Sequence, residues 1–261
     1  MMRCEEIIEK LEQIAPVKYA EGWDNVGFLA GRREKKIKTV FIALDATEEI
    51  IDEAIEVGAD MILTHHPLIF KPVTRVNGDD FIGRRLVRLL QNDICYYAMH
   101  TNFDVVAMAQ AAADELGLTD TRVLSVTFDD GNKKEGIGRY GKGERIMSLA
   151  EWAAYVKEVF RLKYVNVYGD LEMPVETVAV CPGSGKSVVK DAVAAGADVF
   201  ITGDVDHHMG IDLAAQGVGV IDAGHYGLEK IFTPYMKDFL KKEIPSIQIH
   251  MAEEKNPFYT L

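Results

Sequence analysis

Thr39-Val-Phe-Ile-Ala43 and Glu53-Ala-Ile-Glu-Val-Gly-Ala-Asp-Met-Ile-Leu-Thr64 align without a gap to Thr177-Val-Ala-Val-Cys181 and Asp191-Ala-Val-Ala-Ala-Gly-Ala-Asp-Val-Phe-Ile-Thr202. The offset is 138 residues in both segments, and the shared Gly-Ala-Asp and threonine positions stay in register. Each copy begins and ends with an apolar run, which is typical of a strand buried on both faces. A helical pattern that ends at a glycine lies between the two runs. The chain therefore contains a duplicated strand–helix–strand unit.

The flanking sequence continues this alternation of strands and helices. Around the first copy we expect helices at residues 2–15, 47–57, 81–90 and 105–116 and strands at 40–44, 61–63 and 94–99. Around the second copy we expect helices at 187–195, 210–216 and 228–241 and strands at 177–181, 199–201, 218–221 and 247–250. This order favours an α/β fold of internally duplicated α/β/α units with mainly parallel sheets.

The segment between the copies, residues 121–170, has a different character. It contains a polar turn at 129–134, a glycine-punctuated strand candidate at 136–141 and a predicted helix at 149–160. We therefore expect two units. Residues 1–125 hold the N-terminal helix and the first copy, and residues 126–261 hold the middle segment and the second copy.

Composition narrows the class of protein. The chain has 261 residues, 48% of them hydrophobic, and a net charge of −12, which argues against a general nucleic-acid binder. No apolar run approaches the roughly 18–20 residues of a membrane span, and the charged N-terminal helix does not resemble a signal peptide. Cys95 and Cys181 lie in predicted strands, where reduced, buried thiols are expected. These features predict a cytoplasmic protein.

Two histidine–carboxylate pairs follow predicted strands in the two halves. They are His100-Thr-Asn-Phe-Asp104 and His225-Tyr-Gly-Leu-Glu229, each with a spacing of four residues. Their offset is 125 rather than 138, because the first copy carries 13 extra residues after its double histidine. Two copies that face each other across a pseudo-twofold axis would build one shared metal site from such pairs.

The other histidines support a metal site. Six of the seven fall just past predicted strands, the edge where α/β sheets bind ligands; with the nearby carboxylates, the set is His65, His66, His100, Asp104, Asp204, His207, His208, His225 and Glu229. Imidazole and carboxylate without thiolate suit Zn, Mn, Fe, Co or Ni. The ligands exceed the three that one catalytic zinc needs, which indicates two ions, with Asp104 and Glu229 as the best bridging candidates. The adjacent His65 and His66 can serve one site only if the backbone turns, as Pro67 makes credible.

Several motifs, in order along nearly the whole chain, resemble the GTP cyclohydrolase 1 type 2 family, also called Nif-three-like proteins. They are Trp23-Asp-Asn-Val-Gly27, Thr64-His-His-Pro-Leu-Ile-Phe70, His100-Thr-Asn-Phe-Asp104, Ile201-Thr-Gly-Asp204 and Ile221-Asp-Ala-Gly-His-Tyr226 with Glu229. The resemblance implies a Nif-three-like fold, a dinuclear metal centre between the halves and a toroidal homohexamer with its sites facing an internal cavity. The implied ligands are His65, His66, Asp104, His225 and Glu229, while His100 and His208 match positions that line the pocket.

This chain departs from the family pattern after the first histidine–carboxylate pair. The family has a glycine-rich segment there, whereas residues 105–114 are Val-Val-Ala-Met-Ala-Gln-Ala-Ala-Ala-Asp, which puts the shape of the adjacent pocket and the substrate in question. The middle region is also too short for the inserted domain of some members. Pro182-Gly-Ser-Gly-Lys-Ser187 lacks the first glycine of a full phosphate loop, since Val180 stands in its place. It either binds an anion through helix amides or forms a tight turn.

These features lead to a hydrolase hypothesis. Two divalent ions per chain would activate water, and His100 or His208 would transfer the proton. The family name points to ring opening of GTP, whereas the residues alone support hydrolysis of a small molecule at a dinuclear centre. One alternative is a non-catalytic metal-binding scaffold or metal-handling assembly protein. Another is a nucleotide-binding regulator that uses residues 183–187.

Overall fold

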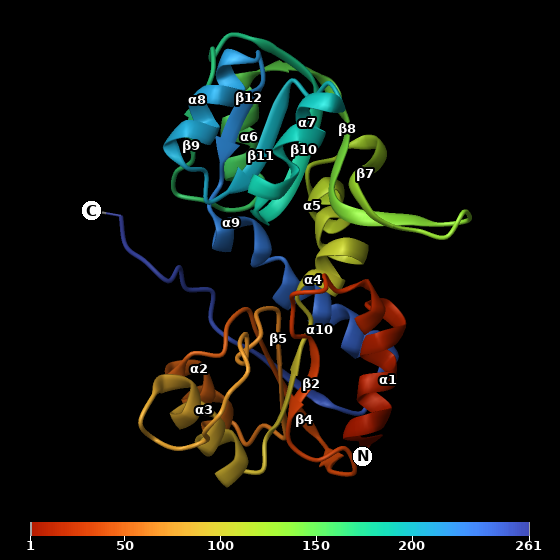
Figure 1. The fold of residues 1–261 in the computed structure, drawn as a ribbon, viewed down its shortest axis with the longest axis vertical. Helices are drawn as coiled ribbons and strands as arrows, with labels where there is room; N and C mark the ends of the chain where they lie inside the picture. Colours follow the sequence, from red (N-terminus) through yellow and green to blue (C-terminus); the bar gives the residue numbers. More distant parts are fainter. Residues whose placement is uncertain (1, 261) are drawn as a thin grey trace. The chain divides into compact units, whose positions relative to one another are not determined.

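The computed structural model describes residues 2–260, which form two compact units (Figure 1). Unit 1 is built from residues 2–103 and 232–254, and unit 2 from residues 104–231 and 255–260. The boundary expected from the repeat, at 125/126, lies within a strand of unit 2. The boundary between the compact units therefore differs from the boundary between the two sequence repeats.

Unit 1 contains a five-stranded sheet in the order β13-β4-β5-β6-β2. The first four strands are parallel and β2 is antiparallel, so this sheet is mainly parallel, as expected. The strands are β2 (Gly27–Ala30), β4 (Thr39–Ala43), β5 (Met61–Thr64), β6 (Cys95–Ala98) and β13 (Gln248–Met251), and a separate antiparallel pair is β1 (Met2–Arg3) with β3 (Lys36–Ile37).

The helices of unit 1 agree with the apolar periodicity of the sequence. They are α1 (Cys4–Ile14), the 3-10 turn η1 (Val17–Tyr19), α2 (Glu48–Glu56), α3 (Phe81–Gln91), α4 (Thr101–Phe103) and α10 (Phe232–Glu243). Thr47 caps α2 by accepting a hydrogen bond from the amide of Ile50 at 3.2 Å. One face of α2 packs Ile51 and Ala54 into a core with Ile62 of β5.

Unit 2 contains a six-stranded mixed sheet in the order β7-β8-β10-β11-β12-β9. Only β10, β11 and β12 run parallel; the other three strands pair antiparallel. The strands are β7 (Thr119–Asp129), β8 (Lys134–Ser148), β9 (Asn166–Tyr168), β10 (Pro174–Ser184), β11 (Val199–Gly203) and β12 (Gly219–Asp222).

Helices cover both faces of this sheet. Alternate residues of β10 enter two different cores, because successive side chains of a strand point to opposite faces: Val178 and Val180 pack with α5 and α6, and Ala179 and Cys181 with α7 and α8. The helical elements are η2 (Asp104–Met108), α5 (Ala109–Glu115), α6 (Leu149–Val159), η3 (Gly185–Val188), α7 (Val189–Ala194), α8 (His207–Ala215) and α9 (His225–Glu229). The expected α/β/α layering is confirmed.

The sequence repeat is also a repeat of hydrogen bonds. One carboxylate oxygen of Asp60 accepts from the amide of Thr39 at 3.1 Å and from the preceding amide at 2.8 Å. Asp198 does the same with Thr177, at 2.8 Å, and with the preceding amide, at 2.9 Å. The shared aspartate of the Gly-Ala-Asp motif thus holds the start of the preceding strand in each copy.

Three expectations differ in detail. The strand candidate at 136–141 lies within β8, the second strand of a long hairpin with β7, and β9 was not predicted. The helix expected at 228–241 is two helices, α9 and α10. The last strand, β13, pairs with β4 of unit 1 rather than with the second copy. Cys95 and Cys181 are buried thiols, as expected, and Cys4 is buried as well. Among residues 2–260 we find no helix with the length and apolarity of a bilayer span.

Candidate metal centre

Three histidines meet at the carboxyl edge of the unit 1 sheet. His65 and His66 follow β5, and His100 follows the neighbouring parallel strand β6. The ring centroids are 4.8 Å apart for His65 and His66, and each of these rings lies within 5.5 Å of His100. One ring nitrogen of each lies within 4.8 Å of the others, so the group could hold a metal ion.

A turn after β5 lets both adjacent histidines take part. The amide of His66 donates to the carbonyl of Leu44 at 2.9 Å, while its carbonyl accepts from the hydroxyls of Thr64 at 2.8 Å and Tyr96 at 2.9 Å. These bonds fix the backbone where an extended strand would send the two rings to opposite faces.

The three rings share one hydrogen-bonding pattern. The Nδ1 atom of His65 lies 2.7 Å from the carbonyl oxygen of Met99, that of His66 lies 2.8 Å from Asp45, and that of His100 lies 2.9 Å from Asp24. Carbonyl and carboxylate oxygens only accept, so each Nδ1 carries the hydrogen, and a neutral ring has its lone pair on Nε2. Metal-binding histidines are held in this way, so these residues fit a metal ion.

Asp24 is the most heavily bonded of these partners. Its side chain is fully covered and accepts hydrogen bonds from the His100 ring and from the amide and hydroxyl of Thr101, at 3.1 and 2.5 Å. Burial raises the pKa of the Asp24 carboxyl, but the hydrogen bonds from His100 and Thr101 outweigh it, and the pKa falls to about 2. Asp24 is therefore an ionised acceptor that orients His100.

Unit 2 repeats the pattern around His225. Its Nδ1 atom lies 2.8 Å from Asp204, and its Nε2 atom lies 3.0 Å from the carboxylate of Glu229, one turn along α9. Asp204 directly follows β11 and has a φ of 56°, a left-handed conformation that is uncommon outside glycine. Such strain is often found at functional sites.

Two glycines make room for this histidine–glutamate pair. A Cβ atom on Gly183 would lie 2.3 Å from Oε1 of Glu229 and 3.6 Å from Nε2 of His225. A Cβ atom on Gly203 would lie 2.3 Å from the His225 amide nitrogen. The segment considered as a phosphate loop thus has a packing role: Gly183 lets the backbone of β10 approach the pair.

Asp104 lies in the same unit. It opens the π-helical turn η2, a feature frequent at functional sites. Burial raises the pKa of the Cys181 thiol, and the charges of Asp104 and Glu229 raise it further. Both carboxylates therefore act on one buried thiol, and their combined negative charge suits a cation.

The structure does not place all the expected residues in these clusters. His208 stands in the exposed first turn of α8, where its ring packs at 5.3 Å against that of His207. His250 lies on β13.

Two groups of the site, Asp45 and the Met99 carbonyl, are not among the residues predicted from the sequence. Asp45 follows β4 as His65 and Asp204 follow β5 and β11. The position of Asp45 just after a predicted strand could therefore have identified it as a candidate site residue.

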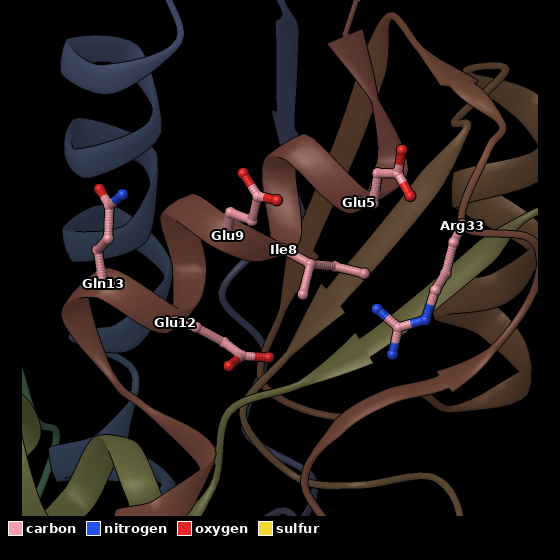
Figure 2. Close-up of a pocket in the computed structure, with 6 residues that line it drawn as sticks. All are labelled: Glu5, Ile8, Glu9, Glu12, Gln13 and Arg33. Carbon is pink, nitrogen blue, oxygen red and sulfur yellow. The ribbon is translucent and has the colours of Figure 1, made fainter.

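A separate hollow of about 550 Å³ on unit 1 contains no histidine (Figure 2). Glu5, Glu9 and Glu12 of α1 line it together with Ile8, Gln13 and Arg33. The guanidinium of Arg33 lies 5.0 Å from the centroid of the Phe28 ring. This acidic surface does not include the candidate metal ligands.

Fold and site together define an α/β protein with a duplicated unit and with a histidine cluster at its strand ends that could hold a metal ion. Residues 2–257 match the family model described as Duf34/NIF3 (NGG1p interacting factor 3), and the chain belongs to this family. It is 36% identical over 267 residues to the GTP cyclohydrolase 1 type 2 homolog of Clostridium perfringens, covering 98% of this chain and 99% of that one. These matches confirm the resemblance seen in the motifs.

Solved structures agree with this assignment. A Bacillus cereus protein related to NIF3 superposes with a TM-score of 0.89 at 25% identity, covering 100% of this chain and 99% of that one. Reduced HcgD from Methanocaldococcus jannaschii superposes with a TM-score of 0.84 at 32% identity, covering 97% and 98%. The Nif-three-like fold is thereby confirmed.

Proposed function

We propose that this protein is a hydrolase that depends on two divalent metal ions, with His65, His66, Asp104, His225 and Glu229 as ligands. The observation that carries the proposal is the Nδ1 contact that all three ligand histidines share, while Nε2 of His225 lies 3.0 Å from Glu229, the residue proposed as a ligand beside it. At His65, His66 and His225 a carbonyl or carboxylate oxygen holds Nδ1, which gives a neutral ring the tautomer that binds metal through Nε2.

The chain's own residues would have distinct tasks. His65 and His66 supply two imidazoles from unit 1, and unit 2 supplies one imidazole and the two carboxylates suited to bridging. Bound divalent ions would lower the pKa of a coordinated water and polarise the group under attack. His100, oriented by Asp24, would hold or release a proton at Nε2. His208 is the second candidate for that proton transfer.

The substrate class is part of the proposal. Relatives bear the name GTP cyclohydrolase 1 type 2 homolog, which supports a small nucleotide-like substrate, with opening of the GTP ring as the specific candidate. We extend the proposal to a cytoplasmic protein that assembles as a homohexamer, as the family resemblance implies. The native ion is one of Zn, Fe, Mn, Co or Ni.

The test is metal content per chain, measured by mass spectrometry on protein purified without chelator. We expect about two ions in the natural chain, as the ligand surplus implies, and fewer in His65→Ala and Glu229→Gln. His250→Ala is the matched control because it removes a histidine on β13, and it should keep the full content. Turnover of GTP and of a phosphoester is then measured on the loaded proteins.

Each outcome has a clear meaning. Loss of metal in both ligand variants, with turnover in the natural chain only, supports the hydrolase. Metal without turnover of any substrate favours the metal-handling alternative. A chain that binds none of Zn²⁺, Mn²⁺ or Fe²⁺ refutes the proposal.

A further inference from the structure

Two exposed aromatic rings stand beside the histidines of unit 1. Trp23 is 60% exposed and Phe70 is 47% exposed. Their ring centroids are 5.8 Å apart, and they lie 6.1 and 6.3 Å from the ring of His100. Large apolar side chains left in water next to polar groups often mark a binding site.

The loops that carry the two rings are fixed by polar contacts. Trp23 directly precedes Asp24, whose covered carboxylate accepts from His100 and Thr101. The side-chain amide of Asn25 donates at 2.5 Å to the carbonyl of Ile69, the residue before Phe70. One short segment therefore ties both rings to the histidine that they flank, and a prearranged site loses less entropy when it binds a ligand.

Trp23 and Phe70 do not cover each other by parallel stacking. The planes of Trp23 and Phe70 are tilted by 51°, so the two rings do not stack face to face. Both meet the His100 ring edge-on, at 76° and 68°. The pair thus combines two largely exposed aromatic side chains with a polar imidazole beside them. A planar heteroaromatic ring needs this combination, because its face stacks and its edge forms hydrogen bonds.

We infer that Trp23 and Phe70 form a stacking platform for the base of a nucleotide, next to His100. The inference rests on the proposed function, since it names what selects the substrate at that site. The exposed tryptophan and phenylalanine bind the base by its face, and the sugar and phosphate add no recognition at this platform. The protein therefore discriminates between compounds with and without a base.

Tryptophan fluorescence gives a direct test, because the only other tryptophan, Trp152, is 1% exposed in the core of unit 2. Guanosine 5′-monophosphate is titrated into the full chain, both metal-free and zinc-loaded, and ribose 5-phosphate serves as the base-free probe. We expect saturable quenching with the nucleotide only. Calorimetry should show roughly 5- to 150-fold weaker binding for Trp23→Leu and Phe70→Leu, as expected for one stacked base.

Two variants serve as controls. Trp23→Phe should retain most of the affinity because it keeps an aromatic face. Phe81→Leu should leave the affinity unchanged, since Phe81 is equally exposed, at 53%, but packs against Arg85.

Several results would overturn the inference. These are equal binding of ribose 5-phosphate, unchanged affinity in Trp23→Leu, loss of bound metal in that variant, and a concentration-dependent blue shift of Trp23 emission, which would indicate burial by a second copy. Failure of the proposed function looks different. A natural chain that binds no metal but keeps base-dependent quenching refutes the hydrolase and retains the platform.

Discussion

Asp24 connects the two loops of the candidate site through one side chain. It accepts from the His100 ring, from the amide and hydroxyl of Thr101, and from the amide of Asn25 at 2.8 Å. A carboxylate can satisfy all of these donors because it has two oxygens and no hydrogens when ionised. The low pKa of Asp24 keeps it ionised at neutral pH.

Asp24→Asn replaces one acceptor oxygen by a donor group in this covered position. We expect the free energy of unfolding to fall by about 1–3 kcal/mol, because at least one donor loses its partner. Urea unfolding of the metal-free protein measures the change. Asp238→Asn, an exposed change on α10, is the control and should have almost no effect. Equal stability of the two variants would show that the Asp24 contacts contribute little.

Gly183 controls the space around Glu229. Gly183→Ala is expected to destabilise the fold for two reasons. Its φ of 72° is unfavourable for alanine, and the new Cβ atom would lie 2.3 Å from the Glu229 carboxylate. A melting temperature several degrees below that of the natural chain is the expected result. Gly22→Ala is the matched control, since a Cβ atom there has nothing within 4 Å. A normal melting curve for Gly183→Ala would refute the packing role.

At the scale of elements, the sequence predicted the helices and strands that depend on local features, namely capping residues and apolar spacing. The helix at α2 follows from the Thr47 cap and apolar spacing, and the parallel strands follow from their apolar runs. The single helix predicted at 228–241 is two helices in the structure. The apolar spacing continues through Pro234, although the first helix ends before it. Proline is tolerated in a first helical turn and therefore marked the new start of α10.

Contacts between segments that are distant in sequence could not be predicted from local patterns. Nothing in residues 248–251 indicates that they pair with β4, some two hundred positions earlier. In the same way, the Asp24–His100 and Asp45–His66 contacts join segments that are distant in sequence. The sequence therefore indicated that His65, His66 and His100 lie at neighbouring strand ends, but not which groups orient them.

The repeated aspartates test the element scale directly. Asp198→Ala should cost about 1–2 kcal/mol of unfolding free energy, because two amides at the start of β10 lose their acceptor. Asp60→Ala should cost more, because Lys35, which is 90% covered, also loses the nearer of its two ion-pair partners, at 3.3 Å. Denaturant titrations measure both, with Asp212→Ala on the exposed side of α8 as control. The reverse order would mean that the Lys35–Asp60 ion pair does not add to the stability of unit 1.

At the scale of the whole molecule, the chain passes between its two units three times. The main part of unit 2 is one continuous segment, whereas unit 1 is assembled from two segments that are distant in sequence. Residues 104–231 contain all six strands of the unit 2 sheet and the helices on both of its faces. Residues 2–103 contain only four of the five strands in the unit 1 sheet. They also lack α10, which buries Phe232, Met236 and Leu240.

Separate fragments should therefore behave differently. We expect residues 104–231 to unfold cooperatively by circular dichroism, because that segment carries its own cores. Residues 1–103 alone should not, because β4 is buried along its whole length and would lose its neighbour β13. Joining residue 103 to residue 232 through a flexible glycine–serine linker, with the chain ending at 254, should restore cooperative unfolding. Cooperative unfolding of 1–103 by itself would mean that the C-terminal strand and α10 are additions to a fold that is already complete.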